Sequence, residues 1–182
     1  WKFVKKLIGE KNGIFEAHSV VSLKELLNKK KNKLSYHHLV SFTQQVGNQY
    51  VNLEKDGYGK VFIDIDDIVV VHKNETLQDS IFLCLGLKDV NKIENLDIKI
   101  NFPYKKSRNS TFFSPELKNG KTFPLKIRKT SCIFSLAALI SSCVKPGYEL
   151  ENKIEHLTSL NETKLYYGLL RCLEEDPYNR YY

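Results

Sequence analysis

Three carboxylates lie close together in an apolar stretch of this 182-residue chain, Lys-Val-Phe-Ile-Asp-Ile-Asp-Asp-Ile-Val-Val-Val-His at positions 60–72. Asp64, Asp66 and Asp67 could bind a metal ion or take up a proton. If the stretch is extended, Asp64 and Asp66 share a face, because side chains alternate along a strand. No further carboxylate or histidine cluster lies nearby to complete the oxygen shell that Mg²⁺ requires. We therefore predict no metal site and no cofactor.

The histidines and cysteines give no better candidate. His37 and His38 are adjacent, and neighbouring positions of a helix do not face each other. The cysteines are far apart in the sequence and have no metal-binding spacing; they are Cys84, Cys132, Cys143 and Cys172. We interpret them as reduced thiols in the core of an intracellular protein.

The uncharged segment Ser131–Val144 is the element around which we expect the rest of the chain to pack. Apolar and small residues occupy every side of a helix drawn through it, which predicts a buried central helix. The segment is shorter than the ~18–20 residues that cross a bilayer, and Lys145-Pro146-Gly147 ends it, so we expect no membrane span.

The remaining periodicity predicts a β-hairpin followed by a mostly helical body. Positions 1–21 read as two short strands. Ser22 and Glu25 form the pattern of a capping box at the start of a short helix. Further predicted elements are a long helix over 34–55, a short buried strand over 80–86, a loop with little regular structure over 88–129, and helices over 150–160 and 161–173.

The chain carries 28 Lys and Arg against 21 Asp and Glu, a net charge of +7. This excess is moderate and scattered, so it favours a solvated surface over a nucleic-acid site. The chain also opens on Trp1, which leads us to expect that it was cut from a longer polypeptide.

Three motifs resemble parts of the protein kinase large lobe, in the same order. Phe112-Phe-Ser-Pro-Glu-Leu117 resembles the Ala-Pro-Glu end of the activation segment. Cys132-Ile-Phe-Ser-Leu-Ala137 is similar to the Asp-x-Trp-Ser-x-Gly start of the central helix, with Phe134 in place of Trp. Cys172-Leu-Glu-Glu-Asp-Pro-Tyr-Asn-Arg180 resembles the closing Leu-x-x-Asp-Pro-x-x-Arg pattern.

The resemblance implies an α+β, mainly helical fold, with a residual hairpin and hinge of the small lobe at 1–21 and a large lobe at 22–182. Glu16, Ala17 and His18 resemble the hinge. It also implies a structural ion pair between Glu116 and Arg180.

The chain departs from the kinase pattern at the residues that catalyse phosphoryl transfer and bind magnesium. Aligned on Ile68, the catalytic loop has Phe62 at the position of the catalytic Asp and Asp67 at that of the metal-binding Asn. A frame shifted by two residues makes Asp64 the catalytic Asp. Cys84-Leu85-Gly86 resembles the Asp-Phe-Gly motif, so a thiol replaces a magnesium ligand. Cys132 replaces the Asp of the central helix.

The strands that carry the glycine-rich loop and the phosphate-binding Lys of kinases are not recognisable in this chain. Together with the lost carboxylates, this implies a pseudokinase: a catalytically inactive scaffold or allosteric regulator that binds another protein.

Two alternatives remain open. One is an atypical active Ser/Thr kinase that uses Asp64 or Asp67. The other is a basic helical module that binds nucleic acid through Lys29–Lys33, Lys105, Lys106, Arg108, Arg128 and Lys129.

Overall fold

The computed structural model describes residues 17–29, 34–73, 80–85, 90–103, 110–144 and 155–181. Its helices are α2 (Leu23–Lys29), α3 (Tyr36–Lys55), α4 (Pro115–Asn119), α5 (Ser131–Val144) and α6 (Lys164–Cys172). Short 3₁₀ turns are η1 (Ile65–Asp67), η3 (Ser110–Phe112) and η5 (Glu155–Leu160). The strands are β1 (Ser19–Ser22), β2 (Tyr58–Lys60), β3 (Ile68–His72), β4 (Ile81–Cys84), β5 (Val90–Glu94), β6 (Asp97–Ile100) and β7 (Leu125–Arg128).

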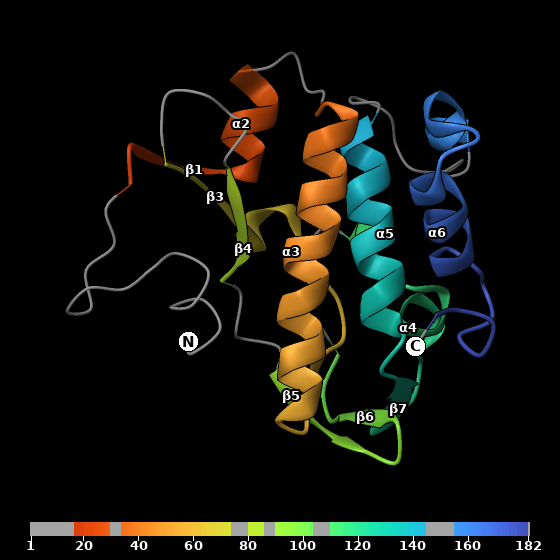
Figure 1. Ribbon diagram of the computed structural model, residues 1–182. Coiled ribbons are helices and arrows are strands. Elements are labelled where there is room, and N and C mark those ends of the chain that lie inside the picture. The colour runs from red at the N-terminus through yellow and green to blue at the C-terminus, as the bar shows by residue number, and fades with distance from the viewer. Residues whose placement is uncertain are drawn as a thin grey trace.

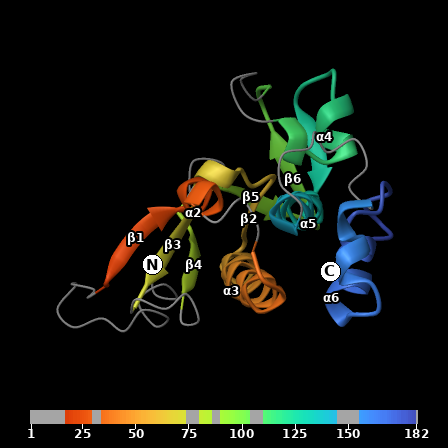
Figure 2. The same cartoon turned by 90° about the horizontal axis from the view of Figure 1, so that it is seen from above.

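Helix α5 lies between α3 and α6 at the centre of the molecule (Figures 1 and 2). It is buried along nearly its whole length, including Ser131 and Ser135, and only Ile133 and Ser142 are partly exposed. The predicted buried central helix is thus confirmed, because a helix that is apolar all round has no face suited to water.

The start of α2 was also predicted correctly, from Ser22 and Glu25. The Ser22 amide donates to Glu25 Oε2 at 2.9 Å, and the Glu25 amide donates to Ser22 Oγ at 3.1 Å, which is the predicted capping box. These bonds lower the pKa of Glu25 below its ordinary value. The long helix predicted over 34–55 is α3.

The strands form two antiparallel sheets. One has the order β1-β3-β4 and the other the order β2-β5-β6-β7. The first sheet packs with α2, α3, α5 and α6 around the main hydrophobic core. A second core lies against the four-stranded sheet and consists of Val61, Phe62, Ile98, Ile100, Leu117 and Ile127.

The expectation of a mainly helical, kinase-like large lobe is wrong. About 49% of the described residues are helical and 22% are in strands, arranged in two antiparallel sheets, whereas a kinase large lobe is mainly helical. β1 is bonded along its length to β3, with Ser19 opposite His72, so the strand predicted near the N-terminus belongs to a sheet in the body of the protein. Its predicted hairpin partner lies in residues 1–16, outside the described residues.

The loop predicted over 88–129 is also wrong in its described parts, because β5, β6, β7 and α4 lie there. β6 alternates in burial along its length, and β5 does so from Asn91 onward; the two strands meet at a tight turn. Asn95 and Leu96, the turn residues, both have positive φ values, 52° and 70°. Prolines and charged residues in the segment are typical of a loop, and the period-two alternation of these strands is too short to stand out beside them.

Two glutamines of α3 bind the edge of β4 that β3 leaves open. Gln45 Oε1 accepts from the Phe82 amide at 2.7 Å, and Gln49 Oε1 accepts from the Cys84 amide at 3.0 Å. The Gln49 side-chain amide donates in return to the Phe82 carbonyl at 2.9 Å. Side chains of a helix therefore take the place of a further strand.

Candidate functional site

The segment that resembles a catalytic loop is held by two serines of α5. Ser131 Oγ donates to the Val61 carbonyl at 2.9 Å. Ser135 Oγ accepts from the Ile63 amide at 2.7 Å and donates to the Ile63 carbonyl at 3.0 Å. All of these groups are buried and cannot bind bulk water, so the two serines supply the hydrogen-bond partners that the backbone groups need.

Phe62, between these two anchored residues, is part of the second hydrophobic core. Its side chain is fully buried and its ring contacts that of Phe113 edge to face, with centroids 4.6 Å apart. A buried phenyl ring has no group that can accept a proton or orient a hydroxyl. In the alignment on Ile68, the position of the catalytic Asp is therefore occupied by a core residue.

Asp67 is bound within the protein. Its Oδ2 lies 3.1 Å from the Nζ of Lys60, whose side chain is 2% exposed, and also accepts from the Asp64 amide at 3.1 Å. The Lys60 side chain is buried and that of Asp67 is 15% exposed, so separating the two charges would remove a counter-charge from the buried ammonium group. Asp67 is thus a structural partner of Lys60.

The three carboxylates do not share a face. Residues Ile65–Asp67 form the turn η1, so the extended segment expected there is interrupted. Asp64 is buried, whereas Asp66 is exposed and lies 4.0 Å from Nζ of Lys24 on α2. Among the described residues, no group of three or more His, Cys, Asp or Glu side chains could hold a metal ion.

Cys84 lies beside Tyr50 and Cys132. The Tyr50 hydroxyl is 3.4 Å from Cys84 Sγ. Burial, and then the two neighbouring thiols, raise the pKa of Tyr50 well above its ordinary value. Burial likewise raises the pKa of Cys132, which nearby Lys60 offsets only in part. Tyr50 and Cys132 are therefore neutral at pH 7, and this cluster is unsuited to a hard cation such as Mg²⁺.

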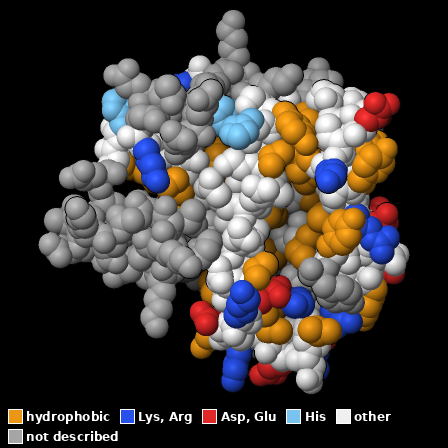
Figure 3. All heavy atoms as spheres, viewed as in Figure 1, with side chains coloured by type: hydrophobic (Ala, Val, Ile, Leu, Met, Phe, Trp, Pro, Cys, Tyr) orange, Lys and Arg blue, Asp and Glu red, His pale blue; other side chains and the backbone are white. Residues whose placement is uncertain are grey.

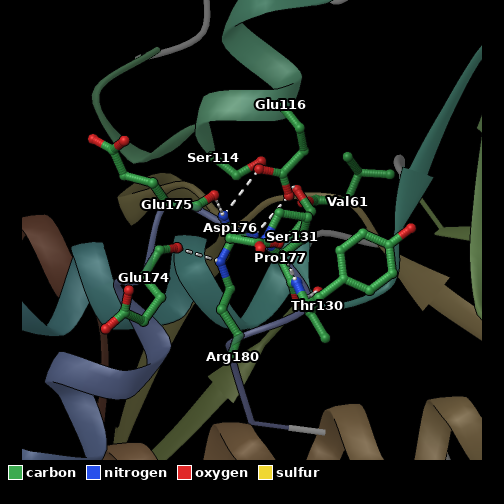
Figure 4. A network of polar contacts seen from close by, with 11 residues as sticks. Val61, Ser114, Glu116, Thr130, Ser131, Glu174, Glu175, Asp176, Pro177 and Arg180 are labelled. Atoms are coloured by element: carbon green, nitrogen blue, oxygen red, sulfur yellow. Dashed lines mark hydrogen bonds and ion pairs between the residues drawn. The ribbon is translucent and has the colours of Figure 1, made fainter.

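Glu116 and Arg180 form the expected ion pair, in a bidentate arrangement (Figure 4). Arg180 Nη1 and Nη2 donate to the two carboxylate oxygens of Glu116 at 2.7 and 3.0 Å. Arg180 Nε donates to the Glu174 carbonyl at 2.7 Å, and Nη2 also donates to the Glu175 carbonyl at 2.8 Å. The guanidinium also lies 4.8 Å from the centroid of the Phe134 ring. Arg180 thus joins α4, α5 and the C-terminal segment.

The hinge-like residues are only partly described. Glu16 lies outside the described residues, and Ala17 and His18 are exposed. The His18 amide donates to the His72 carbonyl at 2.8 Å, which extends the pairing of β1 with β3. Nothing in this geometry distinguishes these residues as a ligand site.

Sequence reasoning missed the hydroxyl groups around the start of α5. Ser114 Oγ lies 2.7 Å from Ser131 Oγ, and Thr130 Oγ1 donates to the Pro177 carbonyl at 3.0 Å. Ser131 and Ser135, four residues apart on a helix with no charge, were the available signal. Hydroxyls on one face of a buried helix must find partners.

Neither a family model nor a curated protein matches this chain. Within the part of the chain that the structure describes, no helix is long and apolar enough to cross a membrane.

Proposed function

We propose that this chain is a catalytically inactive relative of protein kinases that acts as a protein-binding scaffold or regulator. The observation that carries the first part of this proposal is the burial of Phe62 in the second hydrophobic core. Kinase relatedness itself rests on the order of the three sequence motifs and on the bidentate pair between Glu116 and Arg180.

The other candidate groups support the loss of catalysis. Phosphoryl transfer relies on a carboxylate that orients the hydroxyl and on side chains that hold magnesium. Asp67 is bound to Lys60, and Cys84 is beside the neutral Tyr50. Each missing group of this kind costs orders of magnitude in rate.

The active-kinase alternative depends on Asp64 or Asp67, and both are placed unfavourably. Asp64 is 8% exposed, which limits its access to a substrate hydroxyl. The carboxylate of Asp67 would have to leave the buried Lys60 before it could bind a metal.

In the nucleic-acid alternative, two of the basic side chains are already paired with carboxylates of the protein. Arg128 lies 3.5 Å from Asp97, and Lys129 lies 2.7 Å from Glu54. Of the other residues in that hypothesis, Lys29 is described and exposed, and the rest lie outside the described residues.

An intracellular location is part of the proposal. All four cysteines are free thiols, which agrees with a reducing compartment.

The test is phosphoryl transfer by the full-length protein with Mg²⁺-ATP and a general protein substrate. We expect no phosphate incorporation and no shift of the thermal midpoint on addition of Mg²⁺-ATP. Incorporation that Asp64→Asn abolishes would contradict the proposal. Asp66→Asn is the matched control, because it removes an exposed carboxylate from the same turn.

A further inference from the structure

Three exposed lysines follow one another across the outer face of the four-stranded sheet. Lys99 on β6 lies directly opposite Lys126 on β7. The pairing of Ile93 with Ile98 places Lys92 of β5 in register with Lys99 on the other side. All three side chains are exposed, and Tyr58 on β2 lies opposite Lys92. We call Lys92, Lys99 and Lys126 the lysine row.

The lysine row does not contribute to stability through pairing within the described chain. None of its members forms an ion pair with a described carboxylate. Like charges directly opposite each other on neighbouring strands destabilise a sheet, since their Cβ atoms lie about 4.5–5.5 Å apart. The three ammonium groups are therefore available to a negatively charged ligand.

The next row on the same face has a different character. Glu94 lies opposite Asp97, and Asp97 lies opposite Arg128, which binds it. Residues two apart on a strand are separated by about 7 Å, so acidic groups border the lysine row. The space-filling view shows Lys and Arg side chains at the lower end of the molecule, where Figure 1 places β5 to β7, interspersed with acidic ones (Figure 3).

This pattern of charges favours one class of ligand. A nucleic-acid backbone carries a continuous run of phosphates and would be repelled by the exposed Glu94 where it left the lysine row on that side. A protein segment can instead place a few acidic residues on the lysines and a basic residue beside Glu94.

We propose that the lysine row is the docking site for a short acidic segment of a partner protein. This inference rests on the proposed function, for which it supplies the binding surface and the chemistry of the partner. The acidic side chains bind the three ammonium groups, and the affinity falls as salt screens these exposed charges.

The experiment measures binding of a labelled peptide with the core Lys-Glu-Glu-Glu-Lys by fluorescence anisotropy at low salt. A peptide with Gln in place of Glu is the ligand control. The test variant is Lys92→Gln/Lys99→Gln/Lys126→Gln. The control variant, Lys55→Gln/Lys118→Gln/Lys164→Gln, removes the same charge from exposed positions on three helices.

We expect the test variant to weaken binding of the acidic peptide by roughly tenfold, the control variant to leave it nearly unchanged, and the Gln peptide not to bind. Equal losses in both variants would mean that net charge alone attracts the peptide, and would overturn the proposal. So would no binding to the unmodified protein.

An oligothymidylate provides the nucleic-acid comparison. If it binds the lysine row more tightly than the peptide and displaces it, the partner is not an acidic protein segment and the proposal fails. Weaker binding of the oligonucleotide supports it.

Lys126→Glu separates binding from folding. It replaces a like-charge pair with Lys99 by an opposite-charge pair, so the thermal midpoint should stay equal or rise while peptide binding weakens. Binding as tight as that of the unmodified protein would contradict the proposal. The peptide-binding assays contain no nucleotide. If the acidic peptide does not bind the lysine row, the proposed lack of phosphoryl transfer is therefore unaffected. Phosphoryl transfer, in turn, would contradict only the proposed function.

Discussion

At the residue scale, Arg180 shows how a buried charge is made tolerable. Its side chain is 0% exposed, and its donors bind one carboxylate and two backbone carbonyls. Such a group is stable only while its partners are present, because a buried charge without them pays the full cost of leaving water.

Glu116→Ala should therefore lower the free energy of unfolding by about 3–5 kcal/mol, since it leaves the guanidinium of Arg180 buried without its counter-charge. Urea denaturation measures this loss. Glu175→Ala is the control, because it keeps the carbonyl that accepts from Arg180 and removes only an exposed side chain. Equal losses in the two variants would contradict a special role for the Glu116 carboxylate.

Leu96 has a backbone conformation that is unfavourable for a residue with a side chain. Its φ of 70° lies in the left-handed region, which costs a non-glycine residue about 1–2 kcal/mol, and its side chain is 43% exposed. Leu96→Gly should stabilise the protein by about 0.5–1 kcal/mol, after the larger chain entropy of glycine is subtracted. Leu96→Ala keeps the strain and should not stabilise; a rise in thermal midpoint for Ala equal to that for Gly would refute this explanation.

At the scale of elements, the pairing of α3 with the edge of β4 replaces strand–strand bonding. Gln45 and Gln49 are one helical turn apart, so both reach the same strand. The edge of β4 is thereby covered, which leaves the backbone groups bound by the two glutamines unable to pair with another chain.

Gln49→Ala should lower the free energy of unfolding by about 1–3 kcal/mol, because it removes the partners of the Cys84 amide and the Phe82 carbonyl. Gln44→Ala changes an exposed residue of the same helix and should stay within about 0.5 kcal/mol of the unmodified protein. Chemical denaturation measures both. The edge interaction carries no stability if the two variants behave alike.

At the scale of the whole molecule, α5 joins the two hydrophobic cores. Most of its buried residues belong to the main core. Its Ser131 binds Val61 of the second core, and its Ser135 binds Ile63 of the main core. We therefore expect the two sheets to unfold together in one cooperative transition.

Ser135→Ala should destabilise both sheets by about 1–3 kcal/mol, because the buried amide and carbonyl of Ile63 lose their partner. Hydrogen exchange in β3 and β6 should show similar losses of protection. Ser141→Ala is the control: Ser141 is equally buried on α5, but its hydroxyl binds only the Ala137 carbonyl of its own helix. Loss of protection in one sheet alone would contradict the single transition.

The amino-acid sequence by itself determined the local features whose causes lie within a few residues. The burial of Ser131–Val144 follows from the absence of charge, the capping box from Ser22 and Glu25, and α3 from its three- and four-residue apolar spacing. The pairing of Glu116 with Arg180 was available only through the resemblance to kinases, since nothing local connects residues so far apart.

Only the tertiary structure decided the sheets, the environment of Phe62 and the partners of Asp67. Short strands such as β5 and β6 are stabilised by cross-strand contacts and by the core beneath them, which a sequence window does not contain. The same is true of charge: Asp67 looked like a possible ligand until the fold brought the buried Lys60 to it, and Lys99 and Lys126 became neighbours only because β6 and β7 pair. Long-range contacts set the chemistry of these residues, because burial and neighbouring charge depend on how distant segments pack.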